Sequence, residues 1–490
     1  MKNRKISKLL ALGLTFALGV GMSTAFAASS VVPATTRVTV DGQAVSVDAY
    51  NINNGNNYFS LRDFASNLDV GLTWDAATDT AAIDTTAHYK PDETQLITGN
   101  WAPATRARIQ AVIDENANQG KYVVFDFDNT SVIFDVQEAL LMYQIENLVF
   151  AIEPGEMAAV LETGIPDLNL SMGVSLDGKA ITPATLVADL VSDYTWIYNN
   201  YEGMNGSHDL DYIHASNEYQ DFEAKLRFMY NNLGDYFDHA VSYPWVTYLF
   251  TGMTPAEVQE LATASHQYWA AYGRYASETL TSPLELPGET GIVSTSYTTG
   301  LTFTDELLDL YHTLMANGID VYIVSASPID TILAANACMG YGVPEENVFA
   351  MRNKLGADGR YINEYNYDWG GEGMYAQTQG EGKSTIITNF IAPQYNGAGP
   401  LMVFGDSSGD WNMMTDWMES GDTVLGVIFN RYRSTSDPIW QGSTEAAAAI
   451  GDPDARFVLQ GRDENTGELR PSEYSILLGS TQEVLVRPAS

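Results

Sequence analysis

Two pairs of acidic residues stand out because each pair follows a short apolar run. Asp126 and Asp128 come directly after Tyr122-Val123-Val124-Phe125, and Asp406 and Asp410 follow Leu401-Met402-Val403-Phe404. In an extended backbone residues i and i+2 point to the same side, so the first two carboxylates are expected to converge. Like charges that close are costly unless a cation or a proton lies between them. The pair could therefore hold a divalent metal ion or, through a raised pKa, donate a proton.

Two further segments carry groups that suit an anionic ligand. Val321-Tyr322-Ile323-Val324 ends in Ser325-Ala326-Ser327, which offers a hydroxyl and free backbone N–H groups. Gly382-Lys383-Ser384-Thr385 opens a helix and supplies a cation in a chain with few basic residues. Each feature alone has an ordinary structural explanation as a turn, a helix cap or a solvated side chain. Their ordered occurrence at strand ends and at a helix start favours one shared site.

The elements that must position these residues alternate between helix and apolar strand. A helix-like stretch over residues 101–118 precedes the first strand, a helix opening at Asp305 and ending at Gly318 precedes the second, and a helix over 385–391 precedes the third. This alternation predicts an α/β fold with a doubly wound, Rossmann-like parallel sheet covered on both faces. Ligands of such sheets bind beyond the carboxyl ends of the strands, where the polar residues gather.

The four segments together resemble the four motifs of haloacid dehalogenase-like phosphatases, over roughly residues 100–435. The resemblance implies that Asp126 attacks phosphorus to form an aspartyl-phosphate and that Asp128 acts as the acid and base. It further implies that Ser325 and Lys383 hold the phosphoryl oxygens. The implied Mg²⁺ ligands are Asp126, the carbonyl oxygen of Asp128, and Asp406, with Asp410 in a supporting position.

The long interval after the first strand corresponds, by this resemblance, to a large helical cap over about residues 136–300 that selects substrates. Segment 194–275 is rich in aromatic and acidic residues, which suits a quaternary ammonium group. The candidates for a pocket wall are Tyr194, Trp196, Tyr198, Trp245, Tyr248, Tyr268, Trp269 and Tyr272, although packing between helices is the simpler explanation for any one of them.

A finer resemblance, to exported phosphorylcholine phosphatases, rests on three segments. They are Asp128-Asn129-Thr130-Ser131, Asp135 with Glu138-Ala139-Leu140-Leu141, and Met253-Thr254-Pro255-Ala256-Glu257-Val258. It implies hydrolysis of phosphocholine or a similar small phosphoester. A phosphoserine-type or broad-specificity phosphatase on the same machinery is the enzyme alternative. A surface binding protein with a degenerate core is the alternative without catalysis.

Other readings of single motifs are weaker. Gly382-Lys383-Ser384 resembles the end of a nucleotide-binding P-loop, but the first glycine of that pattern would fall at Gln377 and no buried strand precedes it. His208 and His214 lack metal-ligand spacing and are expected at the surface or in packing. The formal charge of −38 repels nucleic acid and anionic membranes, which excludes both as partners.

The ends of the chain carry signals of location. Residues 1–27 read as an export signal, a basic start followed by an apolar stretch and a small-residue cleavage sequence, and no later segment is apolar enough to span a membrane. Residues 31–87 predict a small α+β module that resembles the copper amine oxidase N-terminal-like (stalk) domain, with possible cell-surface attachment. Residues 436–490 form a C-terminal extension in which 456–460 and 476–478 could add edge strands. Cys338 has no partner for an intrachain disulfide.

Overall fold

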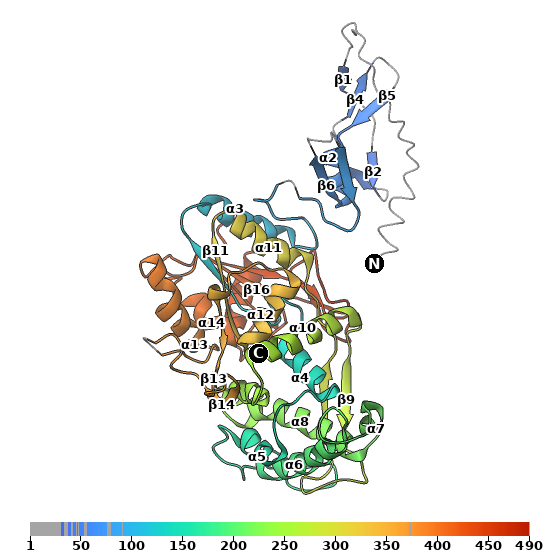
Figure 1. Cartoon of the computed structure of the whole chain (residues 1–490). Coiled ribbons are helices and arrows are strands. Elements are labelled where there is room, and N and C mark those ends of the chain that lie inside the picture. Colours follow the sequence, from blue (N-terminus) through green and yellow to red (C-terminus); the bar gives the residue numbers. More distant parts are fainter. Residues whose placement is uncertain are drawn as a thin grey trace. The chain divides into compact units, whose positions relative to one another are not determined.

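The computed structural model describes residues 31–489 apart from 34–37, 41–42, 46, 48, 53–55, 76–79, 91 and 372–373. The chain divides into two compact units, residues 1–99 and 100–490 (Figure 1). The expected export signal over residues 1–27 lies outside the described residues.

The N-terminal unit is a small α+β module. Its elements are β1 (Val31–Pro33), β2 (Val38–Val40), β3 (Gln43–Val45), β4 (Ala49–Ile52), β5 (Asn56–Phe59), α2 (Leu61–Leu68), β6 (Gly71–Asp75) and β7 (Thr80–Asp84). β1, β4 and β5 form one antiparallel sheet, and β2–β3 and β6–β7 are paired strands. Ser60 begins α2, where its hydroxyl accepts a hydrogen bond from the Asp63 N–H at 3.2 Å. The resemblance to a stalk domain stays a prediction.

A six-stranded parallel sheet forms the centre of the larger unit and confirms the predicted fold class. Its strands, in spatial order, are β12 (Val348–Met351), β11 (Asp320–Pro328), β8 (Tyr122–Phe125), β15 (Met402–Gly405), β16 (Leu425–Phe429) and β17 (Phe457–Gln460). The strand that leads to Asp126 therefore lies between the strand that leads to Ser325 and the strand that leads to Asp406.

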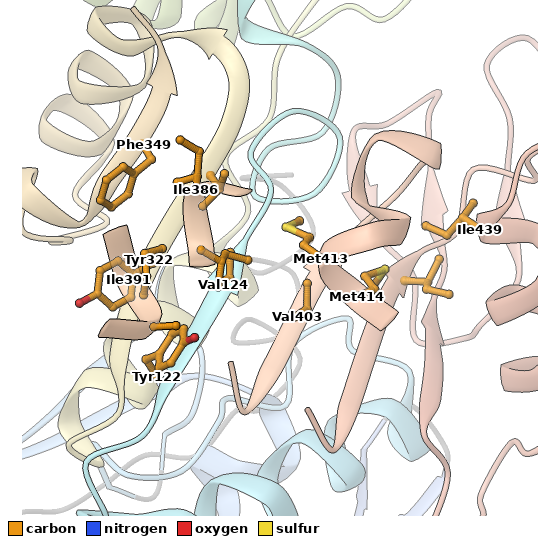
Figure 2. Close-up of a cluster of buried hydrophobic side chains, with 14 of the residues drawn as sticks. Tyr122, Val124, Tyr322, Phe349, Ile386, Ile391, Val403, Met413, Met414 and Ile439 are labelled. Carbon is orange, nitrogen blue, oxygen red and sulfur yellow. The ribbon is translucent and has the colours of Figure 1, made fainter. Parts of the chain in front are cut away.

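Side chains alternate between the two faces of this sheet, and helices bury both faces. Tyr122, Val124 and Val403 point to the face covered by α13 (Glu381–Ile386), the π-helical turn η3 (Ile387–Ile391), α14 (Ser408–Thr415) and α15 (Ile439–Ala448) (Figure 2). On the other face Phe125 stacks on Phe404 at 3.9 Å between ring centroids and contacts Tyr311 of α11 (Asp305–Ala316). Burial on both faces explains why the strands read as continuous apolar runs.

The segment between β8 and β11 builds the cap. Its elements are α4 (Val136–Glu146), α5 (Pro154–Glu162), α6 (Pro183–Asn200), α7 (Leu210–His214), α8 (Asn217–Tyr236), α9 (His239–Trp245), η1 (Val246–Phe250), α10 (Pro255–Tyr272) and the hairpin of β9 (Ser277–Thr281) and β10 (Ser294–Thr298). In Figure 1 the helices α5, α6, α7 and α8 lie together, on the side away from α3 (Pro103–Asn116) and α11.

Shorter elements complete the unit. They are α12 (Ile329–Met339), η2 (Glu345–Asn347), the hairpin of β13 (Asn353–Leu355) and β14 (Tyr361–Tyr365), and η4 (Ala392–Tyr395). A last small sheet contains β18 (Arg462–Asp463), β19 (Glu468–Leu469), β20 (Ser475–Ile476) and β21 (Glu483–Val484). As suggested by the pattern at residues 456–460, β17 is an edge strand of the central sheet, so the core continues past the boundary expected at residue 435. Among the described residues no helix combines the length and the apolarity needed to cross a membrane.

Candidate active site

Three acidic side chains meet at the carboxyl ends of β8 and β15. Asp126, Asp406 and Asp410 are buried, and each offers a carboxylate oxygen within 4.8 Å of the others. The backbone N–H of Asp126 donates to the carbonyl oxygen of Phe404 at 3.0 Å, so the pairing of β8 with β15 fixes the spacing. One divalent ion could contact all three carboxylates across this distance.

Lys383 lies against the same acids. Its Nζ donates to Asp126 Oδ1 at 2.5 Å and to Asp410 Oδ1 at 2.8 Å, and its side chain is 1% exposed. Burial and the neighbouring Asp410 raise the pKa of Asp126 to about 8, against the lowering effect of Lys383. Burial also raises the pKa of Asp410. Even with a second cation at Asp406, the Arg431 guanidinium, the three buried carboxylates keep an excess of negative charge, which a bound divalent cation would relieve.

Asp410 also shapes the loop that carries Asp406. Its Oδ2 accepts from the N–H of Asp406 at 2.9 Å and from the N–H of Ser407 at 3.1 Å, at the first turn of α14. A carboxylate at a helix N-terminus is favoured by the free N–H groups there. The loop is therefore held by the same residue that offers its other oxygen to Lys383.

Asp128 faces a different set of partners from Asp126. Its Oδ2 accepts from Ser327 Oγ at 2.6 Å and its Oδ1 accepts from the N–H of Val136 at 2.7 Å, at the start of α4. Burial, followed by the charges of Asp135 and Asp126, raises the pKa of Asp128 well above its ordinary value. A carboxyl group in this state can hold a proton near neutral pH and donate it.

The strand end at β11 differs in detail from the expectation. Ser325 is fully buried, and its Oγ accepts from the N–H of Ser327 at 3.1 Å. The cavity wall at this point is formed by Ala326 and Ser327, while Ser325 lies behind them. The role assigned to Ser325 stays a prediction, and Ser327 is an additional residue that the sequence analysis did not single out for a role.

The loop after Asp126 holds the side chain and the carbonyl oxygen of Asp126. Thr130 Oγ1 donates to Asp126 Oδ2 at 3.1 Å, and Ser131 Oγ donates to the Asp126 carbonyl oxygen at 2.6 Å. Asn129 has a φ of 61°, a left-handed conformation that asparagine adopts more readily than most residues. The polar residues of this segment therefore hold the turn that follows the strand.

Two arginines that the sequence analysis missed also line the site. Arg431 follows β16 and donates from Nη1 to Asp406 Oδ2 at 2.7 Å. Arg433 lies further along the same loop and donates from Nε to Asp437 at 2.8 Å. Neither residue belongs to a recognisable local motif. The only available signal was the position of Arg431 shortly after an apolar run, Leu425-Gly426-Val427-Ile428-Phe429, like those that precede the acids.

The acids open into a cavity of about 460 Å³ that the cap also lines. The cap contributes polar and aromatic residues from α4, α8 and α9, namely Gln137, Glu138, Tyr230, Asn231, Asp235, His239, Ser242 and Tyr243. None of the eight aromatic candidates for a pocket wall is among the lining residues, and packing between helices, the simpler explanation, holds for three of them.

The reason is visible in three of them. Tyr194, Trp245 and Trp269 are buried between cap helices, and each donates to a backbone carbonyl oxygen, of Ile152, Leu161 and Ala139 respectively. Such side chains pack the cap and do not face a ligand. The P-loop alternative finds no support, because among the described residues no strand leads directly into the helix that carries Lys383. His214 hydrogen-bonds the carbonyl oxygen of Glu146, as expected of a packing residue.

Comparison with known proteins gives one curated relative and one closely similar solved structure. No protein-family model matches the sequence. The chain is 27% identical over 266 residues to the phosphorylcholine phosphatase of Pseudomonas aeruginosa, and the match covers 52% of this chain and 56% of that protein. A conserved protein of unknown function from Anaerococcus prevotii is 27% identical with a TM-score of 0.69, over 78% of this chain and 98% of the other.

The parallel sheet with acids at the ends of its central strands agrees with the fold that the resemblance to haloacid dehalogenase-like phosphatases implies. The curated relative is named a phosphatase. The chain spans about half the length of the curated relative that it matches, so activity and substrate are matters of proposal.

Proposed function

We propose that this protein is a phosphomonoesterase that works through an aspartyl-phosphate on Asp126. The observation that carries the proposal is the contrast between the two acids of one strand end. Asp126 is held by Lys383 among other carboxylates, whereas Asp128 is held by Ser327 and has a raised pKa. A nucleophile and a proton donor are the two groups that this reaction requires.

The steps follow from these positions. An Asp126 oxygen attacks phosphorus, and the bond from phosphorus to the ester oxygen breaks while Asp128 gives its proton to that oxygen. Asp128, now ionised, takes a proton from a water molecule, which attacks the aspartyl-phosphate and releases inorganic phosphate and free Asp126. Lys383 stabilises the negative charge that gathers on the phosphoryl oxygens.

The residues present suit Mg²⁺ as the cofactor. The carboxylates of Asp126, Asp406 and Asp410 and the carbonyl oxygen of Asp128 are oxygen donors of the type that this ion prefers, and their excess negative charge favours a dication. When bound, Mg²⁺ would neutralise charge between the nucleophile and the phosphoryl group. Lys383 and Asp128 keep their own tasks of charge stabilisation and proton transfer.

For the substrate we propose phosphocholine or a similar small cationic phosphoester. Support comes from the named relative and from the cavity wall, where Tyr230 and Tyr243 lie with the acids Asp135, Glu138 and Asp235. Aromatic faces and carboxylates attract a quaternary ammonium group. The alternatives are a phosphoserine-type or broad-specificity phosphatase and, without catalysis, a surface binding protein. Export, and surface attachment through the N-terminal module, remain part of the proposal.

A phosphoester panel tests this function. We expect the full chain to hydrolyse phosphocholine with a higher kcat/KM than phosphoserine or an aryl phosphate. Chelation of Mg²⁺ should abolish the activity and its addition should restore it, and Asp126→Asn should lower kcat at least about 10³-fold. Preference for phosphoserine would refute the proposed substrate alone. No turnover of any phosphoester in the presence of Mg²⁺ would favour the binding protein.

A further inference from the structure

The cavity is poor in cations that can still bind a ligand. Seven acidic side chains line it, those of Asp126, Asp128, Asp135, Glu138, Asp235, Asp406 and Asp410. The cations along its wall are Lys383, Arg431 and Arg433. A phosphoryl group that enters the site is itself an anion, so its binding depends on which of these cations has hydrogen-bond donors to spare.

Lys383 has little capacity left. Its ammonium has three N–H donors, and two of them are used by Asp126 and Asp410. Its side chain is only 1% exposed, so it can turn toward a ligand in few directions. Lys383 can therefore contact the phosphoryl group at one point at most without giving up a carboxylate.

Arg431 is placed differently. One Nη group donates to Asp406 at 2.7 Å, and the rest of the guanidinium has no hydrogen-bond partner among the residues that the structure describes. The side chain is 29% exposed and lines the cavity. A guanidinium carries five N–H donors in a planar fork that fits phosphate oxygens, so four remain for a ligand.

The bond to Asp406 also fixes where those donors lie. Asp406 offers an oxygen within 4.8 Å of an oxygen of Asp126, the proposed nucleophile. A group anchored on Asp406 is therefore within one side-chain length of a phosphorus atom attacked by Asp126. Arg433 also lines the cavity, but among the described residues it pairs with Asp437 and not with an acid of the site.

We propose that Arg431 is a second phosphoryl-binding cation, which holds Asp406 with one Nη group and a non-bridging phosphoryl oxygen with its free N–H groups. The inference rests on the proposed phosphatase function and adds to it a residue from the strand beyond β15. The competing explanation is that Arg431 only neutralises and orients Asp406. The two explanations differ in what the loss of Arg431 does to phosphate binding when Mg²⁺ is saturating.

The test is calorimetric titration of the full chain with inorganic phosphate at saturating Mg²⁺, and separately with Mg²⁺ alone. Arg431→Gln should weaken phosphate binding about 10- to 100-fold, as expected for loss of a charge-assisted hydrogen bond. Arg431→Lys keeps the charge without the fork and should recover part of that loss. Arg433→Gln, the matched control, removes one charge from the same wall and should change phosphate binding less than about threefold.

Three results would overturn the inference. One is phosphate binding by Arg431→Gln as tight as wild type while only Mg²⁺ binding changes. Another is an equal loss of phosphate affinity in Arg433→Gln, which would indicate that the arginines act through the general electrostatic field and not through a direct contact of Arg431. If Arg431→Gln does not fold, wild-type phosphate affinity in Arg431→Lys would have the same meaning. If wild type binds no phosphate and hydrolyses no phosphoester, the proposed function itself fails.

Discussion

At the scale of single residues, the site assigns different tasks to two acids that are two positions apart. Asp126 contacts Lys383 and Thr130, and Asp128 contacts Ser327 and the first N–H group of α4. Separate environments of this kind let one carboxyl group attack while the other carries a proton. The different hydrogen-bond partners of Asp126 and Asp128, more than the presence of two acids, define the proposed chemistry.

Asp128→Asn should expose this division of labour. The amide cannot give a proton to the ester oxygen, so kcat should fall on the order of 10²- to 10⁴-fold for phosphocholine. An aryl phosphate has a leaving group that needs little protonation, and its first step should slow much less. Steady-state rates on the two substrates, with a stopped-flow record of aryl alcohol release, measure the difference. Equal losses in the first step for both substrates would contradict the role of Asp128 as the acid.

Sequence reasoning found the residues that sit in local patterns and missed those defined by distant contacts. Asp126 and Asp406 follow apolar strands, a signal that is readable along the chain. Arg431 becomes part of the site only through a contact with Asp406, and Ser327 through a contact with Asp128 that spans 199 positions. The neighbouring residues do not predict such pairs, because the local sequence does not determine which strands lie side by side in the sheet.

At the scale of elements, the C-terminal segment is tied into the site. Arg462, which begins β18, donates to the side-chain oxygen of Asn129 at 3.0 Å and to its carbonyl oxygen at 3.2 Å. It also pairs with Glu464 at 2.6 Å, and its side chain is 1% exposed. Arg462, from the C-terminal segment, therefore stabilises the turn between Asp128 and α4. From the sequence, edge strands were the only role suggested for this segment, and its contact with Asn129 could not be predicted.

The cap carries an unusual cluster of charge between α6 and α8. Lys225 donates to Asp189 at 2.8 Å and to Asp221 at 2.5 Å, while buried Asp193 has an oxygen without a hydrogen-bond partner among the described residues. Burial and the charge of Asp221 raise the pKa of Asp193 to about 9. The folded cap therefore favours the protonated form of Asp193. In the unfolded chain Asp193 loses this proton near its ordinary pKa of 3.8.

This difference predicts a pH-dependent stability. The contribution of Asp193 is fully present below about pH 4 and is lost as pH rises toward 9, by at most ~1.4 kcal/mol per pH unit. Asp193→Asn cannot ionise, so it should gain stability over wild type as pH rises from 5 to 8. Urea unfolding at both pH values measures the change. A mutant advantage that is the same at both pH values would refute the raised pKa of Asp193.

Helices and strands could be predicted where the pattern of apolar residues was clear along several turns or a whole strand. The pattern was less clear in the cap. The strand at 122–125 has the predicted bounds, whereas the helix expected over 385–391 is α13 followed by a π-helical turn. The role of aromatic residues in the cap, such as Trp269, was ambiguous because the same residue types pack helices together and line ligand pockets. Only the three-dimensional packing of the helices separates the two.

At the scale of the whole molecule, the formal charge of −38 acts on every anion that approaches the site. Salt screens such a field over about 10 Å at 0.1 M. An aryl phosphate dianion should therefore be repelled at low salt, while the ammonium group of phosphocholine offsets part of the repulsion. The sequence shows this charge directly, and the fold adds that seven acidic side chains gather around one cavity.

We expect kcat/KM for the aryl phosphate to rise as ionic strength is increased from about 0.01 to 0.15 M, and to rise less for phosphocholine. Rates measured with a salt that does not bind Mg²⁺ or compete for the site give the comparison. A fall in kcat/KM with salt for both substrates would mean that local cations outweigh the overall charge.

The central claim is that Asp126 takes the phosphoryl group, and chemical trapping tests it most directly. The full chain is mixed with a phosphoester and Mg²⁺, quenched in acid and reduced with borohydride, which converts an aspartyl-phosphate into homoserine. We predict homoserine at position 126 and at no other acid in the peptide spectrum, with none in Asp126→Asn. Turnover by wild type that leaves Asp126 unmodified while another residue carries the phosphoryl group would contradict the account.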